Sequence, residues 1–285
     1  MKETVSLKAK RFVGHGILYI ILILLSVIVL FPVLYSILGS FKTTQELMVS
    51  TSLIPKEFTL DNYLTAWNEI DYGRYTLNSL ICSGCAVLFA VVQTTMNAYV
   101  FSRRNFAGKK VLLTTYMAFL FIGAGPAGMF PVYNILVKLG LNKSLLGLII
   151  RYFGAGISNI LLCMGYLNGI SKEYDEAARI DGCSFFRTYV QIILPLMAPI
   201  AGVIALFAFR GAWNEYLMPM IITTGSPHLQ TLPVATVALK SGGQTATMWS
   251  VMLAAANISM IPMILVYIIC NKQFINGITA GGVKG

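Results

Sequence analysis

Charged residues are scarce in this 285-residue chain, at 11% of the total, whereas hydrophobic residues make up 56%. The mean hydropathy is +0.73. Because soluble globular domains carry about 25% charged residues, this composition excludes an ordinary soluble fold. It predicts an integral membrane protein.

Histidine is also rare, with only His15 and His228 in the whole sequence. Two histidines cannot assemble a His-based metal centre or, at these positions, a Ser-His-Asp relay. We therefore expect no metal site and no catalytic residue in this chain. The shortage of His and of paired acids argues against an intramembrane enzyme.

Nucleotide-binding motifs are missing as well. No Walker lysine motif is present, so the chain is not expected to bind or hydrolyse ATP in the P-loop manner. The stretch GAGPAG, residues 123–128, has the letters of GxGxxG, but it lies in an apolar run, contains Pro126 and follows no strand pattern. A kinked helix with small packing faces is the better interpretation, and we expect no cofactor on this chain.

The five cysteines show no disulfide framework. All of them lie in predicted spans or on the predicted inner side, and the CxxC pair is interpreted as small packing residues of a helix. They are Cys82, Cys85, Cys163, Cys183 and Cys270.

Long apolar runs dominate what is present. A bilayer core of about 30 Å requires roughly 20 apolar residues per helical crossing, and continuous runs favour helices over alternating strands. The sequence predicts an all-α membrane protein with one domain, 1–285, and six transmembrane helices. The spans are approximately 16–38, 76–101, 111–137, 145–167, 195–223 and 249–270.

Lys and Arg concentrate in alternate connections, which predicts the orientation of the spans. Both termini and the segment 171–195 are expected to be cytoplasmic, and the segment 42–75 is expected to be outside. The net charge of +10 is interpreted as topology and lipid headgroup contact rather than nucleic-acid binding. The acidic and aromatic residues of 42–75 suit docking of an external protein, although this segment could be a connector only.

Charged residues inside the predicted spans carry more information, because each is costly unless it faces a partner or water. Arg151 lies in the fourth span, and Arg210 and Glu215 lie in the fifth. Arg210 and Glu215 are about 140° apart around a helix, so each is expected to face something else. We interpret Arg210, Trp213, Asn214 and Glu215 as candidates for a polar translocation path. Alternatively, Glu215 lies near the outer headgroups and Arg210 braces another helix.

The segment 171–195 interrupts two apolar runs with polar residues. Ser171 is suited to cap a first helix, Gly182 to end it in a left-handed conformation, and Ser184 to cap a second helix that runs to Pro195. The prediction is a helix-turn-helix elbow, and we refer to residues 171–195 as the elbow.

One face of the first elbow helix is predicted to carry small side chains at its centre. Tyr174, Ala177, Ala178 and Asp181 share this face, so another protein's groove could approach the backbone closely. The alternative is an elbow that lies on the membrane surface. Its mixture of basic and acidic residues argues against that alternative.

The elbow resembles a known motif at matching spacing. Glu176-Ala177-Ala178, three residues, Gly182, nine residues and then Ile192-x-Leu194-Pro195 is similar to the EAA loop of permease subunits of binding-protein-dependent ABC importers.

Three further stretches resemble the carbohydrate-type branch of that family, which includes the smaller permease of the maltose transporter. They are WNEYLMP at 213–219, IPKEFTLDNYLTAW at 54–67 and FINGITAGGVKG at 274–285. Two small-residue exchanges, at Cys183 and Gly282, depart from the family pattern.

The resemblance implies that the elbow is a coupling helix docked on a separate ATPase subunit. Glu176 would contact the ATPase, Ala177 and Ala178 would permit close seating, and Gly182 would permit the bend. Asp181 and Pro195 complete the coupling set. The tail 271–285, with Thr279, Gly281, Gly282 and Lys284, would reach the interface between two ATPase chains.

The resemblance also implies the partners and the location. The expected partners are a second homologous permease subunit, two ATPase subunits that bind ATP and Mg, an extracytoplasmic solute-binding protein and membrane lipid. The expected location is the bacterial plasma (inner) membrane, with multiple crossings. The expected solutes are oligosaccharides or related sugars. The alternatives are an ion-coupled secondary transporter, and an ABC importer of a non-sugar solute such as glycerol phosphate.

Overall fold

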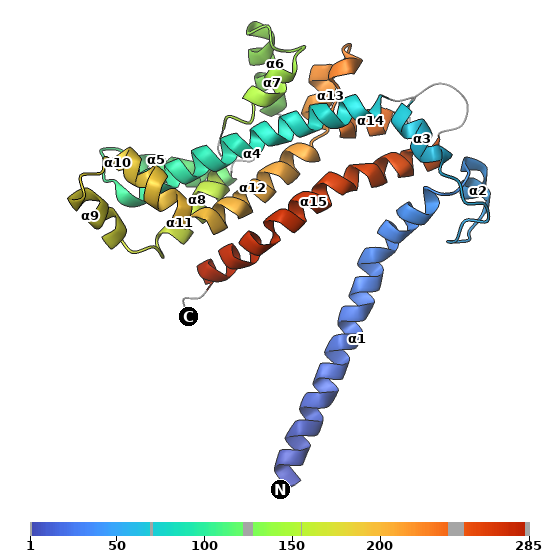
Figure 1. The fold of residues 1–285 in the computed structure, drawn as a ribbon, viewed down its shortest axis with the longest axis horizontal. Coiled ribbons are helices and arrows are strands. Elements are labelled where there is room, and N and C mark those ends of the chain that lie inside the picture. The colour runs from blue at the N-terminus through green and yellow to red at the C-terminus, as the bar shows by residue number, and fades with distance from the viewer. Residues whose placement is uncertain (1, 69–70, 122–127, 155, 239–247, 283–285) are drawn as a thin grey trace. The chain divides into compact units, whose positions relative to one another are not determined.

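The structure is a computed structural model that describes residues 2–68, 71–121, 128–154, 156–238 and 248–282; side chains are not described for 2–14, 121 or 274–282. The part of the chain that it describes contains helices and turns but no strand, which confirms the all-α class (Figure 1). The helices are α1 (Lys2–Gly39), α2 (Thr44–Val49), α3 (Asp61–Asn68), α4 (Tyr72–Arg103), α5 (Lys109–Phe121), α6 (Met129–Lys138), α7 (Leu145–Ile150), α8 (Ile157–Leu167), α9 (Glu173–Ile180), α10 (Phe185–Thr188), the π-helix η2 (Tyr189–Ile193), α11 (Leu194–Leu196), α12 (Ala198–Trp213), α13 (Leu217–Thr223), the 3₁₀-helix η3 (Pro227–Leu229), α14 (Leu232–Ala238) and α15 (Trp249–Gly282).

The chain forms two compact units. The first comprises 1–70 and 238–258, and the second comprises 71–237 and 259–285. The long helix α15 contributes residues to both.

In the first unit, buried amides tie the end of α1 to its neighbours. The Asn62 side chain of α3 donates to the carbonyl oxygens of Ser40 and Lys42, at 2.7 and 2.8 Å. The Asn257 amide of α15 accepts from the Ser36 hydroxyl at 2.9 Å and donates to the Ser36 carbonyl at 3.1 Å. These bonds hold the end of α1 and the residues that follow it against α3 and α15.

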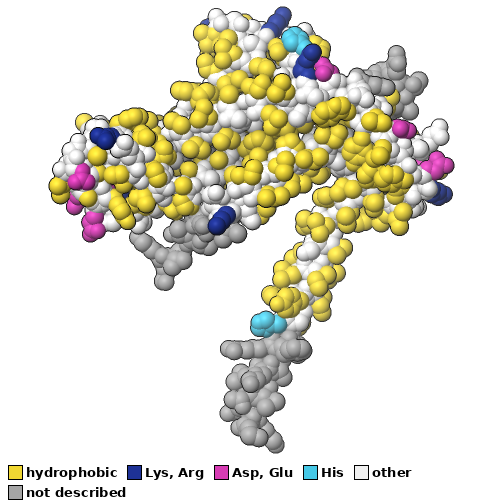
Figure 2. All heavy atoms as spheres, in the orientation of Figure 1, with side chains coloured by type: hydrophobic (Ala, Val, Ile, Leu, Met, Phe, Trp, Pro, Cys, Tyr) yellow, Lys and Arg dark blue, Asp and Glu magenta, His cyan; other side chains and the backbone are white. Residues whose placement is uncertain are grey.

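The apolar part of α1 makes little contact with the rest of the chain. None of its most hydrophobic window, within residues 15–39, is buried, and Figure 2 shows hydrophobic side chains along its described length. A helix that is apolar and exposed in this way suits a lipid environment or a partner subunit.

In the second unit, α4 is the central helix, and α8 and α12 pack against it (Figure 1). One buried cluster joins these three helices to the elbow. Its members are Ala98, Tyr99, Cys163, Leu167, Tyr189, Ile193, Met197, Ile200, Val203 and Ile204.

A second buried cluster lies nearer the start of α4 and joins it to three shorter helices. Its residues are Cys82 of α4, Leu136 of α6, Leu148 of α7, and Met218 and Ile222 of α13. The five cysteines are free in this structure.

Three helices among the described residues are long and apolar enough to cross a membrane: His15–Gly39, Tyr72–Arg103 and Trp249–Gln273. They coincide with the first, second and sixth predicted spans. A bent pair, Phe185–Leu196 with Ala198–Trp213, would add a fourth, with an angle of 81° between its two helices.

Two of the other predicted spans are not continuous helices in the part of the chain that the structure describes. The predicted span 145–167 is two helices, α7 and α8, and 195–223 is divided between α11, α12 and α13. The predicted span 111–137 is represented by α5 and α6, and residues 122–127 between them, which hold most of GAGPAG, lie outside the described residues. Apolar residues continue on both sides of the described interruptions, so mean hydropathy over a span-length window could not predict them.

Gly147 in α7 gives a test of the packing in the second unit. A Cβ atom there would lie 2.2 Å from the carbonyl oxygen of Leu141, a backbone atom that cannot move aside. Gly147→Ala is expected to lower the free energy of unfolding by about 1–3 kcal/mol through overpacking. The thermal unfolding midpoint in detergent measures this.

The matched control is Gly84→Ala in the middle of α4, where a Cβ atom would meet nothing within 4 Å. Alanine is favoured over glycine in a helix by about 1 kcal/mol, so this variant is expected to be at least as stable as the parent. Equal midpoints for the two variants would contradict the packing of α7 described here.

Candidate functional site

The elbow folds as a helix-turn-helix, as predicted. Helix α9 ends at Ile180, and Gly182 has a φ of +78°, the left-handed conformation that glycine adopts without steric cost. Ser184 caps α10, with its side chain accepting from the backbone N–H of Arg187.

Two local details of the elbow differ from the prediction. Helix α9 begins at Glu173 and is preceded by Lys172, although the Ser171 hydroxyl still accepts from the Glu173 N–H at 3.2 Å. The second arm is not one regular helix: it passes from α10 into the π-helical turn η2 and then α11, which contains Pro195. Single π-helical turns inside α-helices are rare and occur frequently at functional sites.

The predicted accessible face of α9 is only partly available. Glu176, Ala177 and Asp181 are exposed, whereas Ala178 is 3% exposed and packs inside the chain. The methyl group of Ala178 therefore seats α9 on its own subunit, and Ala177 lies on the outer surface.

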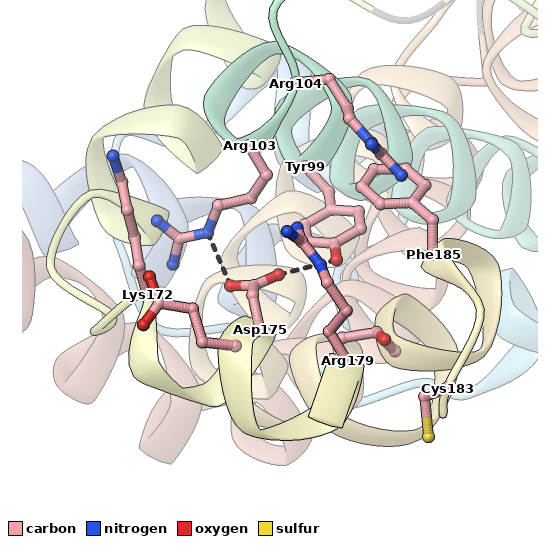
Figure 3. Close-up of a pocket in the computed structure, with 10 residues that line it drawn as sticks. Tyr99, Arg103, Arg104, Lys172, Asp175, Arg179, Cys183 and Phe185 are labelled. Atoms are coloured by element: carbon pink, nitrogen blue, oxygen red, sulfur yellow. Dashed lines mark hydrogen bonds and ion pairs between the residues drawn. The ribbon is translucent and has the colours of Figure 1, made fainter. Parts of the chain in front are cut away.

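A pocket of about 380 Å³ lies between α9, the start of α10 and the end of α4 (Figure 3). It contains more cations than carboxylates. The lining residues are Tyr99, Arg103, Arg104, Lys172, Asp175, Glu176, Arg179, Cys183, Phe185 and Thr188.

Asp175 is the best-anchored residue of this pocket. Its carboxylate forms an ion pair with Arg103 at 3.0 Å and accepts a hydrogen bond from the Tyr99 hydroxyl at 2.7 Å. Figure 3 shows Arg103 and Tyr99 of α4 converging on it. Next to it, the Arg104 guanidinium lies 4.3 Å from the centre of the Phe185 ring, in cation–π geometry.

Two of the three charged residues of the predicted spans, Arg151 and Glu215, lie at interruptions of helices. Arg151 follows α7, and Glu215 lies between α12 and α13. They form an ion pair with side chains 17% and 19% exposed, and the Tyr152 hydroxyl also donates to Glu215, at 2.6 Å. In the non-helical segment after α7, the Phe153 carbonyl accepts a hydrogen bond from the side-chain amide of Gln93 of α4, at 3.0 Å. Free backbone and charged groups at membrane depth require partners of this kind.

The four residues predicted for a translocation path do not form one set. Trp213 is 2% exposed and donates its indole N–H to the Ser259 carbonyl at 3.1 Å, so it is a packing residue in this structure. Glu215 is engaged by Arg151. Arg210 and Asn214 are exposed and share a hollow of about 430 Å³ with Phe207 and Gly211.

The predicted tail residues are only partly described. Thr279, Gly281 and Gly282 continue α15 as helical backbone, and nothing is described of their side chains. Lys284 lies outside the described residues.

The residues that sequence reasoning missed are Tyr99, Arg103 and Asp175, together with the Arg151–Glu215 pairing. None of these three residues was singled out by the sequence analysis. Pairs this distant in sequence leave no local pattern. The one available signal was that Arg151 and Glu215 carry opposite charges in neighbouring apolar spans.

These features define a multi-helix membrane protein with a polar elbow held against a central helix. The chain belongs to the family of binding-protein-dependent transport system inner membrane components, whose family model matches residues 86–275. It is therefore a membrane-embedded permease of an ABC transporter, and its location is the bacterial inner membrane.

Curated relatives match over nearly the whole chain. The galactooligosaccharide transport system permease GanQ of Bacillus subtilis is 33% identical over 98% of this chain and 99% of its own length. A probable permease for starch degradation products, AmyC of Thermoanaerobacterium thermosulfurigenes, is 32% identical over 92% of this chain and 94% of its own length.

A solved structure shares the fold. A bacterial ABC transporter involved in the import of the acidic polysaccharide alginate matches with a TM-score of 0.80 and 22% identity, covering 91% of this chain and 96% of that chain. At this identity the likeness shows the fold alone.

The ion pair at the helix interruptions yields a prediction. Glu215→Gln would leave the Arg151 cation buried without a counter-charge, which costs about 3–5 kcal/mol of stability. The double variant Arg151→Met with Glu215→Gln is expected to recover most of this loss, since an apolar replacement of a whole ion pair is often neutral. Unfolding midpoints in detergent provide the comparison.

Arg210→Gln serves as the control. No carboxylate of the described residues forms an ion pair with Arg210, which is exposed, so its removal is expected to change stability by less than about 0.5 kcal/mol. A double variant no more stable than Glu215→Gln alone would show that charge pairing is not what holds the two interruptions.

Proposed function

We propose that this chain is one of two permease subunits of an ATP-driven importer that moves oligosaccharides or related sugars into the cytoplasm. The elbow docks on a separate ATPase subunit, and nucleotide-driven closure of the ATPase moves the membrane helices. The observation that carries the proposal is the E-A-A…G…I-L-P elbow with Glu176 exposed at a capped helix-turn-helix, in a chain of the permease family.

The proposed topology has six crossings with both termini in the cytoplasm. The crossings are α1, α4, α5 with α6, α7 with α8, α12 with α13, and α15. Basic residues in the connections support this orientation. Interrupted crossings are compatible with a membrane where the free backbone groups find partners in the protein.

The proposed partners are a second homologous permease subunit, two ATPase subunits that bind ATP and Mg, and an extracytoplasmic solute-binding protein. Six crossings would line only half of a path across the membrane, and the exposed apolar surface of α1 is compatible with a neighbouring subunit or with lipid. The tail at 271–285 is proposed to reach the interface of the two ATPase chains.

Sugars are proposed as solutes because several relatives are named for oligosaccharide transport. A second solute class, acidic oligosaccharides, is favoured by Arg210. This cation is exposed in the hollow beside Asn214 and has no ion pair among the described residues. A carboxylate on the solute would satisfy it.

An ion-coupled secondary transporter is less well supported. It would need a free carboxylate near mid-membrane, and Glu215, its one candidate in the predicted spans, is bound by Arg151 and Tyr152.

The proposal is tested by purifying the tagged chain from its native cell in mild detergent. Recovery of a second permease and an ATPase, with vanadate-sensitive ATP hydrolysis in the same sample, is the expected result. A stable single chain without ATPase activity in several detergents would overturn it.

Glu176→Lys tests the elbow within that complex. Reversing the charge of an exposed docking residue is expected to lower ATPase recovery at least about tenfold, while the chain remains in the membrane fraction. Glu57→Lys, the same exchange at an exposed residue of the predicted outer segment, is the control and should leave ATPase recovery unchanged. Unchanged recovery with Glu176→Lys would remove this residue from the docking site.

A further inference from the structure

Arg103 joins three helices at one point. It lies in the last turn of α4, and its side chain is 6% exposed. Its guanidinium pairs with Asp175 of α9 at 3.0 Å and donates to the Ile170 carbonyl at 2.7 Å and, at 3.5 Å, to the Leu167 carbonyl at the end of α8. One side chain therefore bridges the end of α4, the end of α8 and the start of α9.

The charges of this junction match the helix dipoles. Arg103 places a cation at the C-terminal ends of α4 and α8, and Asp175 places an anion in the first turn of α9, which are the charges that the helix dipoles favour at these ends. Removing either charge would leave the other largely buried, since the Asp175 side chain is 13% exposed.

Tyr99 extends the junction to the second arm of the elbow. Its hydroxyl donates to Asp175, and its ring stacks on Phe185 at a centroid distance of 4.5 Å and on Tyr189 at 5.5 Å. The Tyr189 hydroxyl in turn forms a 2.8 Å hydrogen bond with Thr95 of α4. Both arms of the elbow are thus held by α4, α9 through Asp175 and the second arm through aromatic contacts.

The connections of the elbow would otherwise allow it to pivot. Gly182 forms an exposed left-handed turn between the two arms, and a short non-helical segment precedes α9. A force applied to α9 would rotate it about these points if only the backbone held it. The polar and aromatic contacts to α4 would have to break for that rotation to occur.

We propose that Tyr99, Arg103 and Asp175 form a transmission junction that makes the elbow and α4 move as one body. The proposal rests on the proposed docking of an ATPase at the elbow, and it adds the route by which the movement leaves the elbow. The three residues are positioning residues: they do not contact ATP or solute. Their role is to pass displacement of α9 to α4, and through α4 to α12 and α8, which pack against it.

If these three residues had a purely structural role, their substitution would lower stability only. The test therefore measures whether a nucleotide-driven movement at the elbow reaches α12. The reporter is Asn214→Cys at the end of α12, in a background with the five native cysteines replaced by alanine. Alkylation by a membrane-impermeant maleimide is compared before and after ATP–vanadate trapping of the complex with its ATPase subunits. This readout needs no knowledge of the solute.

The test variant is Asp175→Asn, and Asp71→Asn is its matched control. Asp71 also pairs with an arginine, Arg74, at 3.1 Å, but the two side chains are 55% and 53% exposed. The backbone φ of Asp71 is +53°, a left-handed conformation that asparagine also adopts readily. Both variants make the same exchange within an ion pair, and only one of them touches the junction.

With Asp175→Asn, the ATPase subunits are expected to remain bound, while the nucleotide-dependent change in alkylation falls at least about tenfold. With Asp71→Asn, both quantities are expected to match the parent. A full change in alkylation with Asp175→Asn would overturn the junction. Loss of ATPase binding together with the signal would also overturn it, because the residue would then build the docking surface.

Tyr99→Phe carries the same test if Asp175→Asn does not yield folded protein. It removes one hydrogen bond and keeps the ring contacts, so an intermediate loss of the alkylation change is expected. An unchanged signal would contradict the proposal. If the parent protein itself binds no ATPase, the proposed function is wrong, and the junction proposal, which rests on it, fails with it. This outcome differs from a parent that binds the ATPase while the variants show an unchanged alkylation signal, which overturns the junction only.

Discussion

A charged side chain buried at the edge of a bilayer must find its counter-charge and its hydrogen bonds within the protein, and the second unit is organised around this requirement. Arg103 meets it at one end of α4 by pairing with Asp175 and with carbonyls at the end of α8. Arg151 meets it at a helix interruption by pairing with Glu215. Without these pairs the desolvation of each cation would oppose the fold.

The long helix α4 supplies the frame on which these groups are satisfied. Near its C-terminal end, α4 holds the elbow through Tyr99. Further back, Gln93 donates a hydrogen bond to the Phe153 carbonyl in the segment after α7. The first half of α4 packs in the cluster that contains Cys82. A single 32-residue helix thus links the polar elbow to the interrupted helices. Rigid secondary structure of this kind can carry a displacement over its whole length.

The features predicted correctly from the sequence are those set by neighbouring residues. The turn at Gly182 and the cap at Ser184 follow from the preferences of single residues, and the long helices at α1, α4 and α15 follow from hydropathy. The interruptions at 151–156 and 214–216 were not predicted, because apolar residues continue on both sides of them. Whether a helix stops there depends on partners such as Gln93 and Arg151, which are distant in sequence.

The candidate site divides in the same way. Glu176 and Ala177 are exposed, as the motif predicts, because their positions follow from the local geometry of helix α9. The burial of Ala178 and Trp213 does not follow from the motif: each packs on elements of its own subunit, Trp213 through a bond to α15. A residue in a family motif can therefore be retained for the fold of the subunit as well as for its partner.

The exposed apolar length of α1 has a consequence for how its sequence can change over evolutionary time. Since residues 15–35 of this helix are exposed, the chain's own fold places no steric requirement on individual side chains there. Exchanges among Leu, Ile, Val and Phe leave the insertion free energy nearly constant, whereas one central charge would cost about 2.5–3.5 kcal/mol. Within the chain itself, selection on residues 15–35 of α1 therefore acts on overall composition, while the buried positions of α4 are constrained residue by residue.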